Sequence, residues 1–259
     1  MIQIGLIPAP SLPCAEENLA AVRRFAGEAA DRGCAAVCFP EAFLTGYVPE
    51  EASSLGLDAD GPILRRVSFL ADELGIDLLV GFMERSGSGC HLTHGIFRPD
   101  GSRDFYRMTH LGQKEQRCFV PGGQLDIFSL SCGLRVGVQM CVEVHFPDIT
   151  RTLALRGAQV IFAPHAIPRA AGDRAQFWNK IIPARSYDNR VYMACCNQWA
   201  PQRFGGGCLV TDPRGDVTAA CFADGPQLLT AEVDPEMADR YRNGPRYYPG
   251  QRRPELYIL

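Results

Sequence analysis

The fold of this chain is decided by the stretch Val136-Gly137-Val138-Gln139-Met140-Cys141-Val142-Glu143-Val144-His145-Phe146-Pro147-Asp148. Its apolar, β-branched start predicts a buried strand over 134–141, followed by a helix over about 147–156. Cys141 ends the strand, where a side chain can project into a cleft beside free backbone N–H groups. Such groups lower a thiol pKa and stabilise an oxyanion, so the position suits a nucleophile. A thiol that packs as a small hydrophobic residue is the alternative, and this segment alone leaves both open.

Apolar strands and amphipathic helices alternate on both sides of this stretch. Helices are expected over 16–32, 64–74 and part of 177–188, and strands over 35–39, 78–82, 160–163, 190–196 and 228–233. A hairpin is expected from 90–98 and 103–107 around the turn Pro99-Asp100-Gly101-Ser102. This alternation predicts an α/β layered sandwich. Because no linker-like segment divides the chain, we expect one domain over 1–259, with 241–259 as a C-terminal arm over the surface or onto a second subunit.

The composition excludes several classes of function. The net charge is −3 and no basic run stands out, which argues against nucleic-acid binding. No apolar stretch approaches the roughly 18 residues of a membrane span, and the first residues lack the basic segment of a signal peptide. The eleven cysteines form no C-x-x-C pair, which is typical of free thiols in a reducing compartment. We therefore expect a cytoplasmic protein with no nucleic-acid or membrane partner.

The segment Cys90-His91-Leu92-Thr93-His94 contains possible metal ligands. Its alternation before a turn favours a strand entering a hairpin, since metal sites usually show a complete ligand set. The sequence predicts no metal site and no cofactor.

Glu41 is the second candidate for chemistry. The carboxylate directly follows the apolar run 35–39, where burial raises a carboxyl pKa into the range of a general base. A carboxylate at the start of a helix is the alternative interpretation.

Three segments follow one another in a characteristic order: Phe39-Pro40-Glu41, the 106–122 segment that ends Phe119-Val120-Pro121-Gly122, and the Cys141 strand with His145-Phe146-Pro147-Asp148. This ordered set resembles the nitrilase superfamily of carbon–nitrogen hydrolases. The resemblance runs nearly end to end. Further matches are Leu155-Arg156-Gly157-Ala158, Ala184-Arg185-Ser186-Tyr187-Asp188-Asn189, Asn197, and Phe204-Gly205-Gly206-Gly207 before Asp212-Pro213-Arg214-Gly215.

The resemblance implies a four-layer αββα sandwich that assembles into homodimers or larger homo-oligomers. It also implies a Glu–Lys–Cys triad that hydrolyses a small amide or nitrile through a cysteine thioester. Glu41 would be the general base, Cys141 the nucleophile, Glu115 the glutamate that orients the triad, and the Val142 N–H an oxyanion donor. Amides are favoured because amidases dominate the superfamily. His165 follows a strand and a proline, which suits the rim of a substrate pocket.

One position departs from the family in a way that matters. The family pattern Tyr-x-Lys-x-His-Leu reads Tyr106-Arg107-Met108-Thr109-His110-Leu111 here, which puts Met108 at the lysine position of the substrate site. A thioether carries no charge and donates no hydrogen bond, and losing one oxyanion donor costs on the order of a hundred- to a thousand-fold in rate. Without a cation, Glu41 and Glu115 should have raised pKa values. Lys114 fits a surface charge better than a replacement.

Three explanations of Met108 stay open at this point: a weak or inactive family member, a substrate that brings its own positive group, or an engineered chain. Two other classes of function also stay open. One is a non-catalytic relative that binds a small molecule or partner in the old pocket. The other is a Cys–His hydrolase in which His145 or His165 activates Cys141.

A smaller departure from the family pattern follows Cys141. The family usually has an aromatic residue and then an aspartate after the cysteine, whereas this chain has Val142 and Glu143. We expect this difference to alter the shape of the pocket.

Overall fold

Two β-sheets stack face to face in the computed structural model, which describes residues 1–87, 89–245 and 247–257. Among these residues the first sheet has the order β15-β1-β2-β4-β5-β6 with β3 paired to β4, and the second has the order β14-β13-β10-β9-β8-β7. The first sheet contains β1 (Ile2–Leu6), β2 (Ala36–Cys38), β3 (Leu57–Asp58), β4 (Asp77–Ser86), β5 (Gly89–Phe97), β6 (Arg103–Arg107) and β15 (Leu229–Val233). The second contains β7 (Ile127–Ser129), β8 (Arg135–Val138), β9 (Val160–His165), β10 (Tyr192–Asn197), β13 (Cys208–Thr211) and β14 (Val217–Cys221).

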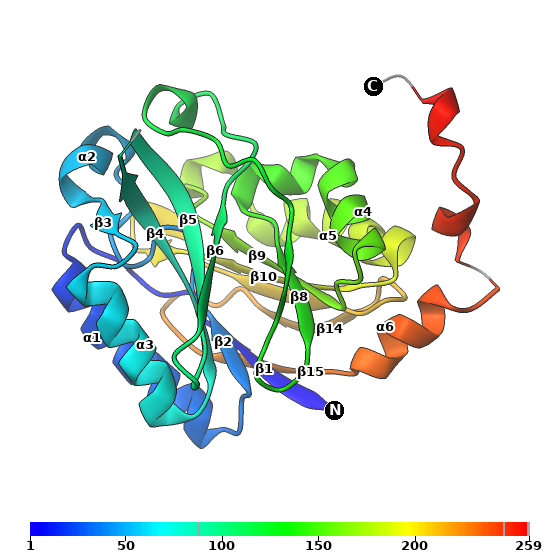
Figure 1. The fold of residues 1–259 in the computed structure, drawn as a ribbon, viewed down its shortest axis with the longest axis horizontal. Helices are drawn as coiled ribbons and strands as arrows, with labels where there is room; N and C mark the ends of the chain where they lie inside the picture. Colours follow the sequence, from blue (N-terminus) through cyan, green and yellow to red (C-terminus); the bar gives the residue numbers. More distant parts are fainter. Residues whose placement is uncertain (88, 246, 258–259) are drawn as a thin grey trace.

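Helices cover the outer face of each sheet (Figure 1). On the first sheet lie α1 (Ala15–Asp31) and α3 (Pro62–Leu74), whose buried stripes form one apolar cluster with side chains of β2 and β4. On the second lie α4 (Pro147–Leu155) and α5 (Arg174–Asn189), which bury Leu153, Trp178 and Ile182. The result is a four-layer αββα sandwich, as the resemblance to the nitrilase superfamily implies.

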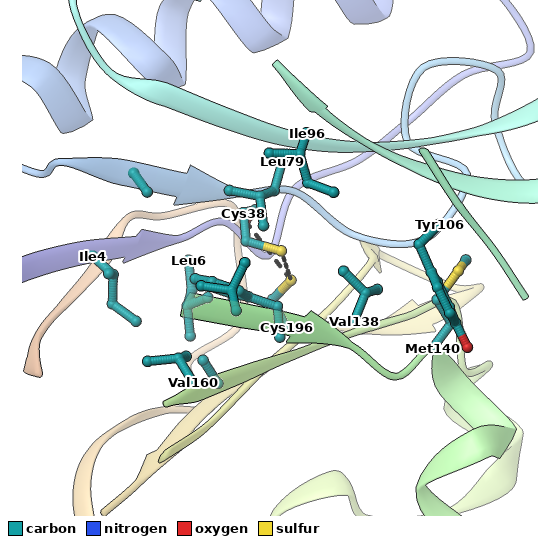
Figure 2. Close-up of a cluster of buried hydrophobic side chains, with 14 of the residues drawn as sticks. Ile4, Leu6, Cys38, Leu79, Ile96, Tyr106, Val138, Met140, Val160 and Cys196 are labelled. Atoms are coloured by element: carbon teal, nitrogen blue, oxygen red, sulfur yellow. Dashed lines mark hydrogen bonds between the residues drawn. The ribbon is translucent and has the colours of Figure 1, made fainter. Parts of the chain in front are cut away.

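The space between the sheets holds the largest apolar cluster. Figure 2 shows side chains from both sheets meeting there, with Cys38 of β2 opposite Cys196 of β10. The two sulfur atoms are 4.0 Å apart, and both residues are fully buried. Burial of this interface removes apolar area from water on both sheets, which is the main force holding the sandwich together.

Most predicted elements are found close to their expected bounds, including the 90–98 and 103–107 hairpin as the antiparallel pair β5 and β6. The predicted strand 134–141 is the main exception, since β8 ends at Val138. The remaining residues turn away from the sheet, and Cys141–His145 form a short 3-10 helix, η3. The helix predicted over part of 177–188 begins earlier, at Arg174, where Asp173 caps it by accepting a hydrogen bond from the Gln176 N–H at 3.2 Å.

The remaining short elements complete the chain: η1 (Pro49–Glu51), α2 (Ala52–Leu55), η2 (Glu115–Arg117), η4 (Arg169–Ala171), β11 (Trp199–Ala200), β12 (Phe204–Gly205), α6 (Pro235–Arg242), η5 (Tyr248–Gln251) and η6 (Pro254–Leu256). After α6 the chain passes α4 and α5 (Figure 1), and its residues Arg252 and Tyr257 line a cavity together with Arg151 and Arg185 of these helices. Of the predicted arm 241–259, residues 246 and 258–259 lie outside the described part. Within the described ranges, no helix is long and apolar enough to cross a membrane.

Candidate active site

Glu41 lies in a tight turn after β2, and its side chain is fully buried. The next residue, Ala42, has φ +50°, a conformation that costs an L-residue energy and often occurs at functional sites. The turn is held from two directions. Gln198 donates its side-chain N–H to the Glu41 backbone oxygen at 2.7 Å, and the Leu44 N–H bonds to the Gly81 oxygen at 2.9 Å. Any side chain at Gly81 would collide with this turn, since a Cβ there would lie 2.6 Å from the Ala42 nitrogen.

Cys141 occupies a similar position after β8 in the second sheet. It has φ +44° and is the first residue of η3, so the backbone turns sharply where the thiol projects. The thiol-bearing residue is partly exposed, unlike the fully buried Cys195 and Cys196. The structure therefore gives Cys141 a strained backbone conformation, which a packing cysteine does not need.

Glu41 and Cys141 face each other, and the backbone N–H of Ala166 faces both. Burial and then the charge of Glu115 raise the pKa of Glu41 well above its usual range, against the opposing effect of the thiol and the N–H. Burial and then the charges of Glu41 and Glu115 raise the pKa of the Cys141 thiol in the same way. Within the described residues, neither carboxylate oxygen of Glu41 has a hydrogen-bond partner of normal geometry.

Glu115 is brought to the same place by η2, and its side chain is buried. The Tyr47 hydroxyl donates a hydrogen bond to it at 2.6 Å, and the Gly112 N–H also donates to its carboxylate. Burial and the charges of Glu41 and Glu115 raise the pKa of Tyr47, so its hydroxyl stays protonated as a donor. The predicted pair of glutamates is thus assembled around Cys141.

Met108 follows β6 and is fully buried in the cluster between the sheets. Its backbone is fixed on both sides, by a bond from its N–H to the Leu92 oxygen and by one from the Gly122 N–H to its own oxygen, each 2.8 Å. Gly122 admits no side chain, because a Cβ there would meet the Arg107 carbonyl. Lys114, the other candidate cation, is exposed.

Glu143 has a larger role than the sequence suggested. Its buried carboxylate accepts hydrogen bonds from the Tyr106 hydroxyl, the Thr109 N–H and hydroxyl, the His110 N–H and the Met140 N–H, at 2.7–3.2 Å. These donors lie on the segment that carries Met108 and on the turn that carries Cys141. Glu143 therefore fixes the two segments relative to each other, instead of mainly shaping the pocket.

His165 is fully buried at the end of β9, not exposed at a rim. Its Nδ1 lies 2.7 Å from the Ala163 oxygen, its ring packs on Trp178, and burial lowers its pKa to about 3. His145 is exposed and packs against Phe177 at 5.2 Å between ring centroids. Val142, the predicted oxyanion donor, lies in the first turn of η3 beside Cys141, where helix N–H groups lack intrahelical partners.

Arg174 is the residue near the site that sequence reasoning missed. At the start of α5 it resembles an ordinary surface charge, yet only 9% of its area is exposed. Its guanidinium interacts electrostatically with Cys141. In the described part of the chain, no cluster of three or more His, Cys, Asp or Glu side chains could hold a metal ion.

The geometry agrees with comparisons to known proteins. The family model for carbon–nitrogen hydrolases matches residues 3–243, and the chain belongs to this family. It is 30% identical to the deaminated glutathione amidase of Mus musculus, over 98% of this chain and 84% of that protein. Its family and its amidase relatives define it as a carbon–nitrogen hydrolase.

Solved structures of an amidase from Nesterenkonia sp. AN1 are similar over almost the whole chain. A mutant in complex with butyramide has a TM-score of 0.84 and 26% identity, covering 98% of this chain and 95% of that one. A second mutant, with acrylamide added at its active-site cysteine, has a TM-score of 0.85 and 26% identity. The similarity covers 99% of this chain and 98% of that one.

Proposed function

We propose that this protein hydrolyses the C–N bond of a small amide through a thioester at Cys141, with Glu41 as the group that moves protons. The observation that carries the proposal is that Glu41 and Cys141 face each other from two strained turns, one after a strand of each sheet. The amidase relatives favour an amide over a nitrile.

The chemistry follows from the two side chains. The Glu41 carboxylate takes the thiol proton, and the thiolate attacks the carbonyl carbon to give a tetrahedral oxyanion, which the Val142 N–H stabilises. Protonated Glu41 then gives its proton to the nitrogen, the C–N bond breaks, and ammonia or an amine leaves. Glu41 next takes a proton from water, the resulting hydroxide attacks the thioester carbon, and the acid and the thiol are released. Glu115, held by Tyr47, positions this pair.

Met108 lowers the rate of this reaction in our proposal. The raised pKa values of Glu41 and Cys141 favour the protonated form of each group, so the ionised pair that can react is scarcer. A cation at position 108 would favour the charged forms of both groups. We therefore propose an impaired enzyme, and its alternative is a non-catalytic relative that binds a small molecule in the same place.

A Cys–His mechanism has less support. His165 has a pKa near 3 and its Nδ1 is bonded to a backbone oxygen, and His145 is exposed and packed on Phe177. We also propose that the chain forms a homodimer or larger homo-oligomer through segments such as the C-terminal arm. Its cytoplasmic location stays a prediction.

Ammonia release from small neutral amides tests the proposal, with butyramide as the first substrate. The wild type should turn over slowly, Met108→Lys should be faster by about a hundred-fold or more, and Cys141→Ala should abolish the reaction in both backgrounds. Met108→Leu is the matched control, because it keeps the apolar packing and should leave the rate unchanged. Silence of the Met108→Lys variant would contradict the proposal and favour a binding protein.

A further inference from the structure

A buried hydrogen bond ties the Glu41 turn to the sheet that carries Cys141. Gln198 directly follows β10 of the second sheet, and its side-chain N–H donates to the Glu41 backbone oxygen at 2.7 Å. Only 1% of Gln198 is exposed, and Glu41 is fully buried. The bond joins residues 157 positions apart in the sequence and crosses from the second sheet to the first.

The other hydrogen bonds that hold this turn come from the first sheet and the helix on its outer face. The Leu44 N–H bonds to the Gly81 oxygen of β4 at 2.9 Å, and the Asn18 side chain of α1 donates to the Leu44 oxygen at 2.9 Å. Neither bond reaches the second sheet. Gln198 is therefore the polar contact that fixes the turn relative to that sheet.

Gln198 is itself held firmly in place. Its backbone N–H donates to the His165 oxygen of β9 at 3.1 Å, and its backbone oxygen accepts from the Gly206 N–H at 2.9 Å. A buried side chain whose backbone is bonded on both sides keeps its amide group in one position. The bond to Glu41 thus starts from a fixed point on the second sheet.

The Glu41 side chain depends on this backbone contact. Within the described residues, neither of its carboxylate oxygens has a hydrogen-bond partner of normal geometry, so the direction of the side chain follows from its backbone. We propose that Gln198 is a positioning residue for Glu41, and that its amide fixes the distance across which Glu41 exchanges a proton with Cys141. The inference rests on the proposed function, because it assigns the proton transfer to Glu41.

Replacing Gln198 by methionine tests the inference. Gln198→Met keeps the length of the side chain and removes the donor, so the turn should move away from the second sheet. A displacement of about 1 Å can cost on the order of a hundred-fold in rate. In the Met108→Lys background we expect kcat for butyramide to fall about ten- to a hundred-fold. KM should change by less than about two-fold, because the substitution acts through Glu41 and not on the substrate.

Gln159→Met is the matched control. Gln159 is also buried, and its side-chain N–H donates to Asp239 at 2.8 Å. It precedes β9, which runs parallel to β10, so it lies at the opposite end of these strands from Gln198. Both variants lose a buried hydrogen bond and should unfold at a lower urea concentration. Only Gln198→Met should lower kcat.

A second measurement does not require turnover. Iodoacetamide alkylates the Cys141 thiolate, and the pH midpoint of this reaction is measured in the protein without the Met108 substitution. The charged groups that act on the thiol are Glu41, Glu115 of η2 and Arg174 of α5. Because the charge of Glu41 raises the pKa of the thiol, moving Glu41 away should lower the midpoint.

Gln198→Met should show this lower midpoint, and Gln159→Met should not. The fully buried Cys195 should stay unlabelled in both variants, which distinguishes a displaced Glu41 from partial unfolding. The expected combination is a thiolate that forms more readily in an enzyme that turns over more slowly.

The outcomes are distinct. A Gln198→Met protein that keeps either the kcat or the alkylation midpoint of its parent overturns the inference, as does an equal loss of kcat in Gln159→Met. Should Gln198→Met not fold, Gln198→Asn removes the same bond by shortening the side chain, with the same expected results. A shifted midpoint without ammonia release, even from Met108→Lys, would reject the proposed function and keep the positioning role of Gln198.

Discussion

The hydroxyl of Tyr106 lies 2.8 and 2.9 Å from the two carboxylate oxygens of Glu143, and both side chains are buried. This pair joins the end of β6 to the turn after β8. Because Met108 lies two residues beyond Tyr106 and Cys141 lies two residues before Glu143, the contact fixes the segments that carry these two residues relative to each other.

Replacing Glu143 should therefore destabilise the protein. The Glu143 carboxylate now accepts hydrogen bonds from the N–H groups of Thr109 and Met140. In Glu143→Gln, the NH2 group of the amide would replace one accepting oxygen and leave a buried N–H donor unsatisfied. We expect the free energy of unfolding to fall by about 2–4 kcal/mol, measured by urea denaturation. Tyr106→Phe should cost less, about 1–3 kcal/mol. Glu50→Gln, at an exposed carboxylate, is the control, and a Glu143→Gln effect no larger than that control would contradict the assigned role.

The raised pKa of Glu41 predicts a pH-dependent stability. The folded protein keeps a proton on Glu41 at pH values where the unfolded chain, with an ordinary pKa of 4.5, has lost it. The stability from this protonation is present at acidic pH and is lost as pH rises from the unfolded toward the folded pKa. Glu41→Gln removes this loss, so the stability of the variant relative to wild type should increase as pH rises above the unfolded pKa of 4.5, by at most ~1.4 kcal/mol per pH unit.

Urea denaturation at several pH values measures this difference. Glu17→Gln, at an exposed carboxylate on α1, serves as the control for general charge effects. A relative stability of Glu41→Gln that stays constant over this range would mean that the Glu41 carboxyl is ionised in the folded protein.

The reactivity of Cys141 should depend on the residue at position 108. A thiol reacts as its thiolate, and the raised pKa keeps Cys141 protonated near neutral pH. We expect iodoacetamide to label Cys141 more slowly than the partly exposed Cys14 in the wild type, and the order to reverse in Met108→Lys. Peptide mass spectrometry gives both rates. Preferential labelling of Cys141 in the wild type would show that another group already stabilises its thiolate.

A methyl group at Gly81 should disturb the Glu41 turn. Its Cβ would lie 2.6 Å from the Ala42 nitrogen and 2.7 Å from the Pro40 oxygen, so the turn must move. We expect Gly81→Ala to lower the free energy of unfolding by about 1–3 kcal/mol. It should also reduce amide hydrolysis in the Met108→Lys background.

Gly27→Ala is the matched control for this substitution. Among the described residues, no neighbouring side chain or packed segment lies within 4 Å of the position that a Cβ would take there. Because Gly27 sits inside α1, alanine should stabilise the protein by up to about 1 kcal/mol. Equal effects of the two substitutions would show that the Glu41 turn tolerates displacement.

The alternation of apolar strands and amphipathic helices predicted an α/β layered sandwich, because periodic apolar residues indicate which face of an element is buried. The four αββα layers were implied by the family resemblance. It also predicted Glu41, Glu115 and Cys141 as one site, and the structure brings all three together. Their catalytic roles stay predictions. The strand expected to reach Cys141 stops at Val138, because apolar character does not distinguish a paired strand from a buried turn.

The contacts that could not be predicted join segments that are far apart in the sequence. Five donors on two separate segments converge on Glu143, and no local pattern records them. The burial of Arg174 was hidden for the same reason, since a charged residue after a capping aspartate is typical of an exposed helix start. The positive φ at Ala42 has no local signal either, because alanine rarely adopts it.

The two facing residues of the site belong to different sheets, Glu41 to the turn after β2 and Cys141 to the turn after β8. Their separation is therefore set by how far apart the two sheets pack, and so by the volumes of interior side chains such as Cys38 and Cys196 (Figure 2). A substitution there that adds or removes a methyl group would alter proton transfer without touching any polar atom of the site. In this architecture the packing of the interior and the reactivity of Cys141 are therefore coupled, because the same side chains determine both.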